Sequence, residues 1–379
     1  MDTNDPDRDK RRLEINVKKF TQLLQSQSLD ICETEKQLRD LSWCGIPDKV
    51  RGPVWKILLG CASLNPERRA RVEEECQKDY TTYVETYWKP VSNTTTNTLL
   101  EEVRKDVTRT KSSDHFNFLM HPTVIHRLER ILFICAIRNS STAYTQGMNF
   151  ILAMLFIVFF GHHTDRSISV LRDWNPSDTE IEVEVEVKAG IEHETETKSA
   201  IDTTCTMPSE TVMLRIEADC FWCLFNIIDK LSDMYNRSLS GILTLQQELN
   251  TFVTLVNPRL EQQLYKHFSG GFEFTTRWFL CLMIQELPWE LGCYTCDALF
   301  SEFSLRDSVV FKQTLVYMVA SYLTLLGTDF GTMTYEQISS ELFNQYSHNS
   351  FRIKDRRDIE LLLAQTQTYK IWSQRQKKQ

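Results

Sequence analysis

Two pairs of closely spaced cysteines are the first residues here whose type and spacing could do chemistry. They are Cys220/Cys223 and Cys293/Cys296, each in a CxxC arrangement. A zinc site would need all four sulfurs to converge, and a thioredoxin-like dithiol would need a βαβ unit around it. The first pair lies in an apolar helical stretch, where cysteines three residues apart commonly fill a core, and the second follows Gly292 in what could be a turn. We therefore expect no metal site.

His162 and His163, followed by Asp165, form a second group of residues that could bind a metal. They lie where an apolar helix meets an acidic stretch, so a solvated loop is the structure expected. The sequence has no HExxH, GxSxG or GxGxxG motif, and no GxxxxGK followed by Ser or Thr. Because these motifs are absent, we predict no self-contained active site.

An outward-facing arginine near the end of a helical stretch offers another chemistry. Leu100, Val103 and Val107 share one face of a helix and can be buried. Arg109 is then roughly opposite Val107, and Asp106 precedes it by three residues, close enough to hold the guanidinium group. Taken alone, this is the pattern of a surface arginine on an amphipathic helix.

The elements that must position these residues are predicted to be helices. Gly and Pro together number 22 of 379 residues, under 6%, where about 12% is usual. Hydrophobic residues make up 42% and charged residues 25%, as in an ordinary globular protein. The expected class is all-α, with two or three domains or one large one.

The helical pattern forms two blocks separated by an acidic insert. We assign 1–34 to a polar tail and an amphipathic helix, 35–350 to the main domain, and 351–379 to a C-terminal helix with a basic tail. Within the main domain, the insert at 163–212 is expected to be disordered or a lone hairpin, with one exposed strand as the alternative.

The net charge of −8 belongs to that insert. Residues 165–210 contain 12 acidic and 4 basic residues, which leaves 39 of each sign in the rest of the chain. A neutral remainder argues against a nucleic-acid partner, which would favour a basic surplus.

The N-terminal helix carries one apolar stripe formed by Leu13, Val17, Phe20 and Leu24. We expect this helix to dock on the domain. Because basic residues surround the stripe, a helix that binds a partner or a membrane surface is the alternative.

Membrane insertion and export are not predicted. The longest apolar run, from Phe150 to Phe160, has eleven residues, the length of a buried core helix and not of a membrane span. The polar N-terminus does not resemble a signal peptide, and the eleven cysteines fit reduced core thiols. We expect a cytoplasmic protein without a transmembrane segment, and peripheral association with a membrane stays open.

Three motifs, in order, resemble the TBC domain, the helical Rab GTPase-activating module. The first spans 43–60 and contains GIP and then RGPVWKILLG; the second, VRKDVTRT at 103–110, resembles IxxDxxRT; the third, YTQGMN at 144–149, contains an intact YxQG. The segments 217–222 and 277–278 also match family positions. The resemblance runs from about residue 38 to residue 350, outside the insert, and implies a TBC fold of two helical subdomains.

The resemblance implies roles for particular residues. Arg109 corresponds to an arginine finger that stabilises charge on the transferring phosphoryl group, worth roughly 10³–10⁵ in rate. Gln146 corresponds to a glutamine finger, whose amide can both donate to and accept from the attacking water. The supporting residues that the resemblance places around them are Asp106, Thr110, Tyr144 and Gly147.

Arg51 and Trp55, in the first motif, are expected to be structural. A tryptophan four residues after an arginine on a helix suits a buried ring that is stacked or hydrogen-bonded. One departure from the family occurs at Cys296, where a tryptophan usually precedes the aspartate that is Asp297 here. It affects packing and leaves the two finger motifs intact.

The function implied is GTPase activation of a Rab-family GTPase in its GTP-bound form, in the regulation of vesicle traffic. Such a protein is an activator without turnover of its own and needs no cofactor, since GTP and Mg²⁺ arrive on the GTPase. Similarity to short Golgi-type members implies a cytoplasmic protein, peripheral on Golgi or endosomal membranes. The alternative is a TBC-fold adaptor or scaffold that binds a GTPase without stimulating hydrolysis.

Overall fold

The computed structural model describes residues 6–26, 30–89, 94–110, 117–139, 142, 144–172, 174, 207–268, 271–343 and 353–376. These residues form helices and connecting loops, with no strand among them, so the all-α prediction is confirmed. The longer helices are α1 (Pro6–Leu24), α2 (Ile31–Ser42), α3 (Asp48–Leu58), α4 (Pro66–Tyr87), α5 (Thr94–Arg109), α6 (Pro122–Arg138), α7 (Met148–Thr164), α9 (Glu210–Lys230), α11 (Ser240–Val256), α12 (Pro258–His267), α14 (Trp289–Ser301), α15 (Val309–Leu326) and α17 (Arg356–Gln376). The shorter ones are α8 (Ile168–Arg172), α10 (Ser232–Tyr235), α13 (Thr276–Leu280) and α16 (Tyr335–Phe343).

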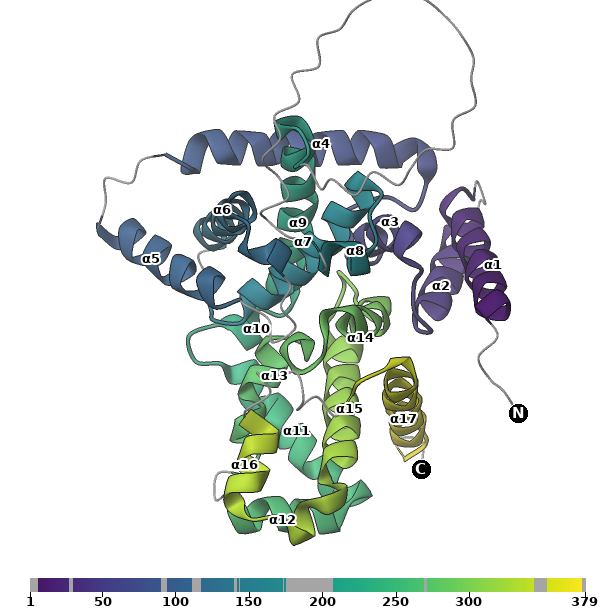
Figure 1. Ribbon diagram of the computed structural model, residues 1–379, viewed down its shortest axis with the longest axis vertical. Coiled ribbons are helices and arrows are strands. Elements are labelled where there is room, and N and C mark those ends of the chain that lie inside the picture. Colours follow the sequence, from purple (N-terminus) through teal and green to yellow (C-terminus); the bar gives the residue numbers. More distant parts are fainter. Residues whose placement is uncertain are drawn as a thin grey trace, which may run out of the picture.

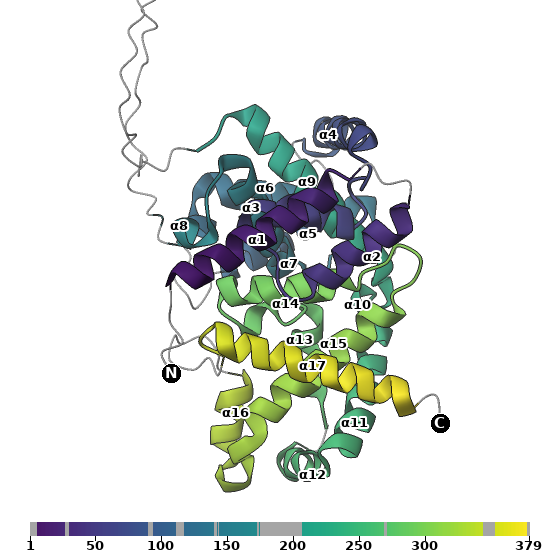
Figure 2. The ribbon, with the colours of Figure 1, turned by 90° about the vertical axis from the view of Figure 1, so that its right-hand side faces the viewer.

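The helices are arranged in two halves. In Figure 1, α3 to α9 make up the upper half and α10 to α16 the lower half. Figure 2 shows α1, α2 and α17 along one side of the molecule. Between the halves, α14 packs against α2, α3, α15 and α17.

α7 is the central helix of the upper half. Every residue from Met148 to Gly161 is buried except Phe150, and the helix packs against α3, α6 and α9. A helix that is apolar on all sides is stable only where neighbours cover it completely. The turn that precedes α7 therefore rests on a rigid base.

Helix starts follow local sequence signals. The side chains of Asn65, His121 and Asn257 each accept a hydrogen bond from a backbone N–H in the first turn of α4, α6 and α12. Each is followed by a proline, whose missing N–H costs nothing at the first helical position.

The N-terminal helix docks on the body through its second half. Phe20 is fully buried and Leu24 is 7% exposed, and α1 packs against α2 and α3. Leu13 was predicted to belong to the same buried stripe but is 52% exposed, because the buried contact lies further along the helix.

The predicted insert, 163–212, is described only at its two ends. Its first residues finish α7 and form α8, where Leu171 is fully buried, and Trp174 beyond α8 is 5% exposed. Its last residues begin α9. These ends are packed parts of the helical body, because their apolar side chains have neighbours to cover them. Residues 175–206, including the predicted strand, lie outside the described residues.

One described helix, α15, is long and apolar enough to cross a membrane by length and composition. Two thirds of it is buried inside the protein, and it packs against α11, α14 and α17. These neighbours give it the setting of a core helix. α17, which the sequence placed outside the main domain, is thus part of the packing of the lower half.

Candidate functional site

Arg109 is the last residue of α5 and points away from the core. Its side chain is 69% exposed, whereas Val103 and Val107 on the opposite face are buried. One guanidinium nitrogen of Arg109 lies 3.7 Å from Oδ1 of Asp106. An ion pair this exposed contributes little to stability. The guanidinium can therefore leave Asp106 for another anion at small cost.

Gln146 is also exposed and lies in the turn that leads into α7. On one side of it, the hydroxyl of Thr145 donates to the backbone carbonyl of Tyr235 at 2.8 Å. On the other, Gly147 has φ of +110°, and a Cβ at this position would lie 3.1 Å from the Cβ of Leu280. Glycine is required here both for the backbone conformation and for the close approach of α13.

A buried polar cluster joins the end of α5 to this turn. The hydroxyl of Tyr144 donates to Oδ2 of Asp106 at 3.0 Å. The amide nitrogen of Asn149 donates to Oγ1 of Thr110 at 2.9 Å and to the backbone carbonyl of Asp106 at 3.3 Å. Its amide oxygen accepts the N–H of Gly147 at 3.1 Å. We call Asp106, Thr110, Tyr144, Gly147 and Asn149 the α5–α7 cluster; it fixes the two motifs relative to each other.

The protonation of Tyr144 suits its place in the cluster. Burial raises the pKa of its hydroxyl well above the ordinary value, and the nearby charge of Asp106 raises it further. The hydroxyl therefore stays a donor to the carboxylate at any physiological pH. That bond occupies one oxygen of Asp106 and leaves the other facing Arg109.

Arg51 and Trp55 lie in a different place, on α3, and both are buried. The indole N–H of Trp55 donates to Oδ1 of Asp297 at 2.7 Å, and Nε of Arg51 donates to the same oxygen at 3.1 Å. The N–H of Ile46 donates to Oδ2 at 2.8 Å. The ring of Trp55 also meets Phe300 edge to face at 4.9 Å. This group ties α3 to α14 and holds the fold.

Comparison with known proteins shows the family of the chain. A family model described as the Rab-GTPase-TBC domain matches residues 48–326. The chain belongs to this family. TBC1 domain family member 22B of Homo sapiens is 30% identical over 285 residues, which are 74% of this chain and 47% of the relative. TBC1 domain family member 22A of Mus musculus is 29% identical over 278 residues, 73% of this chain and 46% of the relative.

A fungal relative and a solved structure extend the match. The GTPase-activating protein gyp1 of Schizosaccharomyces pombe is 25% identical over 362 residues, 93% of this chain and 60% of the relative. The chain thus spans about half the length of the curated relatives it matches. The crystal structure of the Ypt/Rab-GAP domain of Gyp1p is similar with a TM-score of 0.76 and 21% identity, covering 95% of this chain and 99% of that one. It shows that the fold is that of a TBC domain.

Two hydrogen-bonding residues of this TBC domain, Asn149 and Glu217, are not predicted by the sequence motifs alone. Asn149, directly after the YxQG motif, was not singled out, although a buried amide at a helix start signals a hydrogen-bonding role. Glu217 was noted only as a motif match. It is fully buried and accepts hydrogen bonds from Tyr80, Arg127 and Arg130. An acid in an apolar helix is the signal that predicts such a paired site.

The cysteine pairs are core residues of the TBC domain. All four sulfur-bearing side chains are fully buried, and within the described ranges no group of three or more His, Cys, Asp or Glu side chains could hold a metal.

The prediction of a solvated loop at His162 and His163 is wrong. Both lie in the last turn of α7, and Nε2 of His163 is 2.8 Å from Asp219, which also pairs with Lys56.

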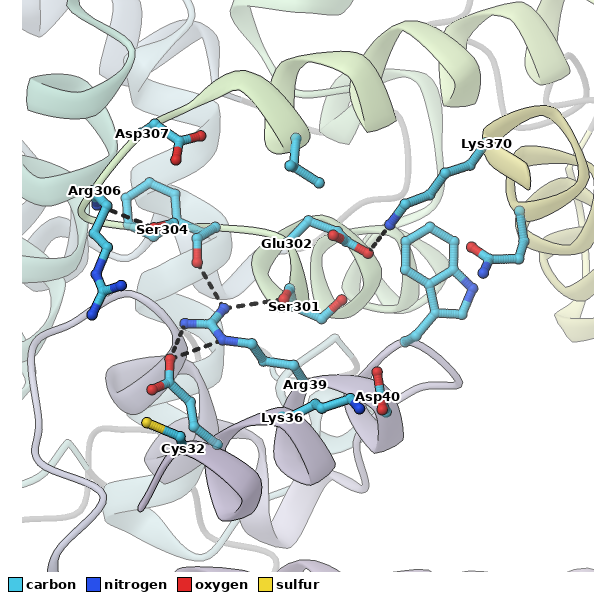
Figure 3. Close-up of a pocket in the computed structure, with 15 residues that line it drawn as sticks. Cys32, Lys36, Arg39, Asp40, Ser301, Glu302, Ser304, Arg306, Asp307 and Lys370 are labelled. Atoms are coloured by element: carbon cyan, nitrogen blue, oxygen red, sulfur yellow. Dashed lines mark hydrogen bonds and ion pairs between the residues drawn. The ribbon is translucent and has the colours of Figure 1, made fainter. Parts of the chain in front are cut away.

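A groove of about 620 Å³ lies between α2, α17 and the chain after α14 (Figure 3). Arg39 reaches across it and donates to the carbonyls of Ser301 and Phe303 at 3.0 and 2.7 Å. Lys370 pairs with Glu302 on its other side. These polar groups hold α2 and α17 to the end of α14, so the groove is a structural junction.

Proposed function

We propose that this TBC domain is a GTPase-activating protein for a Rab-family GTPase in its GTP-bound form. Membership of the Rab-GTPase-TBC family supports this, as does similarity to a relative named as a GTPase-activating protein. The observation that carries the proposal is the α5–α7 cluster. It holds two exposed side chains of the required chemistry, Arg109 and Gln146, on one rigid support.

The chemistry follows from what a small GTPase lacks. Negative charge develops on the oxygens of the transferring γ-phosphoryl group, and the attacking water is poorly oriented. The guanidinium of Arg109 neutralises that charge, and its planar fork gives geometry that a lysine ammonium does not have. The amide of Gln146 orients the water, because it donates and accepts at once.

Asp106 acts as a support for the arginine before the partner arrives. Its ion pair with Arg109 is loose enough to be exchanged for a phosphate oxygen, since the side chain of Arg109 is mostly in solvent. The bond from Tyr144 keeps Asp106 in place during the exchange. The arginine therefore moves while its helix stays fixed.

The chain contributes side chains and no cofactor in this proposal. GTP and Mg²⁺ arrive bound to the GTPase, and the chain completes a catalytic site that belongs to its partner. We propose that it acts from the cytoplasm, on Golgi or endosomal membranes reached through the lipidated GTPase, in the control of vesicle traffic.

The test is GTP hydrolysis by a panel of purified Rab GTPases with the wild type, Arg109→Ala, Arg109→Lys and Gln146→Ala. Both arginine variants are expected to lose roughly 10³-fold or more of the stimulation, the range known for arginine fingers supplied in trans. Arg104→Ala is the matched control, since Arg104 lies on the same helix with its side chain 54% exposed. Its activity should equal that of the wild type.

The adaptor alternative gives a different result in the same panel. Binding that depends on GTP, without any release of phosphate, would select the adaptor. Stimulation that survives Arg109→Ala would refute the mechanism while leaving the activity in place.

A further inference from the structure

We infer that Asn149 is a positioning residue that sets the geometry between Arg109 and Gln146. The inference rests on the proposed function and assigns one further residue to it. Asn149 does not reach the surface, as its side chain is 3% exposed. It acts through the residues that flank the two exposed groups.

The amide of Asn149 bonds to the residues that directly follow Arg109 and Gln146 in the chain. Its nitrogen donates at 2.9 Å to Thr110, the residue that directly follows Arg109. Its oxygen accepts the N–H of Gly147 at 3.1 Å, and that N–H belongs to the peptide bond that Gln146 forms with Gly147. One planar group thus holds the Thr110 side chain next to Arg109 and the backbone N–H next to Gln146.

The bonds around Asn149 form a closed set. Thr110 donates its own hydroxyl hydrogen to the backbone carbonyl of Asp106 at 3.0 Å, so its oxygen is left to accept from Asn149. The nitrogen of Asn149 also donates to that carbonyl at 3.3 Å. Asp106, Thr110 and Asn149 are all buried. Buried hydrogen bonds of this kind hold a single geometry, because leaving any member unpaired is costly.

A second anchor on the Gln146 turn shows what Asn149 adds. Thr145 holds the turn to Tyr235, whose own hydroxyl donates to the carbonyl of Leu280 at 2.9 Å. These bonds attach the turn to the lower half of the molecule. They do not connect it to α5. The link between the turn and Arg109 comes from Asn149 and from the bond between Tyr144 and Asp106.

Chemistry requires an amide at this position. An aspartate could still accept the N–H of Gly147, but it has no hydrogen to give to Thr110 or to the carbonyl of Asp106. An alanine loses all three of the bonds that the amide makes with Gly147, Thr110 and Asp106. A shift of about one ångström at a reacting group can cost about a hundredfold in rate, so kcat should fall while the surface that binds the GTPase stays intact.

The experiment measures kcat and KM for the GTPase that responds in the panel, with Asn149→Ala, Asn149→Asp, Thr110→Val and Thr110→Ser. The first three are expected to lower kcat by about tenfold or more with KM within about threefold, because they misalign groups that act only in the transition state. Thr110→Ser keeps the hydroxyl and should restore kcat. If Asn149→Ala does not fold, the Thr110 pair carries the test.

A second readout separates positioning from stability. Variants that misalign the two groups should bind the GTPase loaded with GDP and aluminium fluoride, a transition-state mimic, about tenfold more weakly, and bind the form with a non-hydrolysable GTP analogue as the wild type does. Asn226→Ala is the matched control. Its amide also bridges two elements, by a 2.8 Å bond to the carbonyl of Leu59, but away from the α5–α7 cluster. It should lower the melting temperature and leave kcat unchanged.

The outcomes are distinct. A wild type that stimulates no GTPase would remove the proposed function and this inference with it. A wild type that stimulates, beside folded Asn149 and Thr110 variants with unchanged kcat, would overturn the inference alone. A loss of binding to both nucleotide forms would assign Asn149 to the stability of the surface and also overturn it.

Discussion

Replacing Asp297 by asparagine tests whether a single buried charge pair holds the first motif to the second half of the molecule. The carboxylate of Asp297 is fully buried and accepts hydrogen bonds from Ile46, Arg51 and Trp55. Asparagine has nearly the same shape. It removes the charge and turns one acceptor, the oxygen that faces the N–H of Ile46, into a donor.

The magnitude follows from what the change leaves behind. Arg51 is 2% exposed and pairs with Asp48 and Asp297. In the variant, the partly exposed Asp48 is the acid that remains paired with it. Removing one partner of a buried ion pair costs about 3–5 kcal/mol, because the other charge stays buried and uncompensated. The whole free energy of unfolding of a native protein is only about 5–15 kcal/mol. The variant should therefore lose a large share of its stability.

Urea unfolding followed by circular dichroism measures the loss. Asp48→Asn is the control, since Asp48 is the other acid paired with Arg51 and the Asp48 side chain is 46% exposed. This change should cost about 1 kcal/mol or less. Trp55→Phe removes one donor to the carboxylate and should fall between the two, at about 1.5–3 kcal/mol. Equal effects for Asp297→Asn and Asp48→Asn would refute the reasoning.

Three further expectations concern pH, backbone and metal. Burial raises the pKa of Glu286 to about 7, against the opposing charge of Arg277. The native state then keeps a proton that the unfolded chain releases near pH 4.5, so the free energy of unfolding should fall as the pH rises through this interval. Urea unfolding at several pH values measures this, and Glu286→Gln should remove that part of the slope. Gly147→Ala places a Cβ 3.1 Å from Leu280 at φ of +110°; we expect a cost of about 1–3 kcal/mol and loss of stimulated GTP hydrolysis, and wild-type activity would contradict the role of the turn. EDTA should leave the melting temperature unchanged; a clear drop would point to a structural metal.

Local patterns in the sequence were enough to predict the helical class and the outward direction of Arg109. Few glycines and prolines favour helices, and the apolar spacing of Val103 and Val107 fixes which side of α5 is buried. These properties depend on residues close together in the chain, where helical periodicity alone decides the geometry. The same reasoning was wrong for Leu13 and for the histidines, because their burial depends on which neighbour covers them.

Only the tertiary structure decided how distant residues pair. Asp297 lies 246 positions after Arg51, and Tyr144 lies 38 after Asp106, so no local pattern indicates that they meet. The order of the motifs indicates the family and, through that resemblance, the roles proposed for Arg109 and Gln146. Asn149 becomes visible as the link between them only when folding brings the end of α5 to the start of α7. The sequence determined which chemical groups are present and which face each helix buries. Their arrangement depends on long-range packing, since a buried hydrogen bond forms wherever folding brings a donor and an acceptor together away from water.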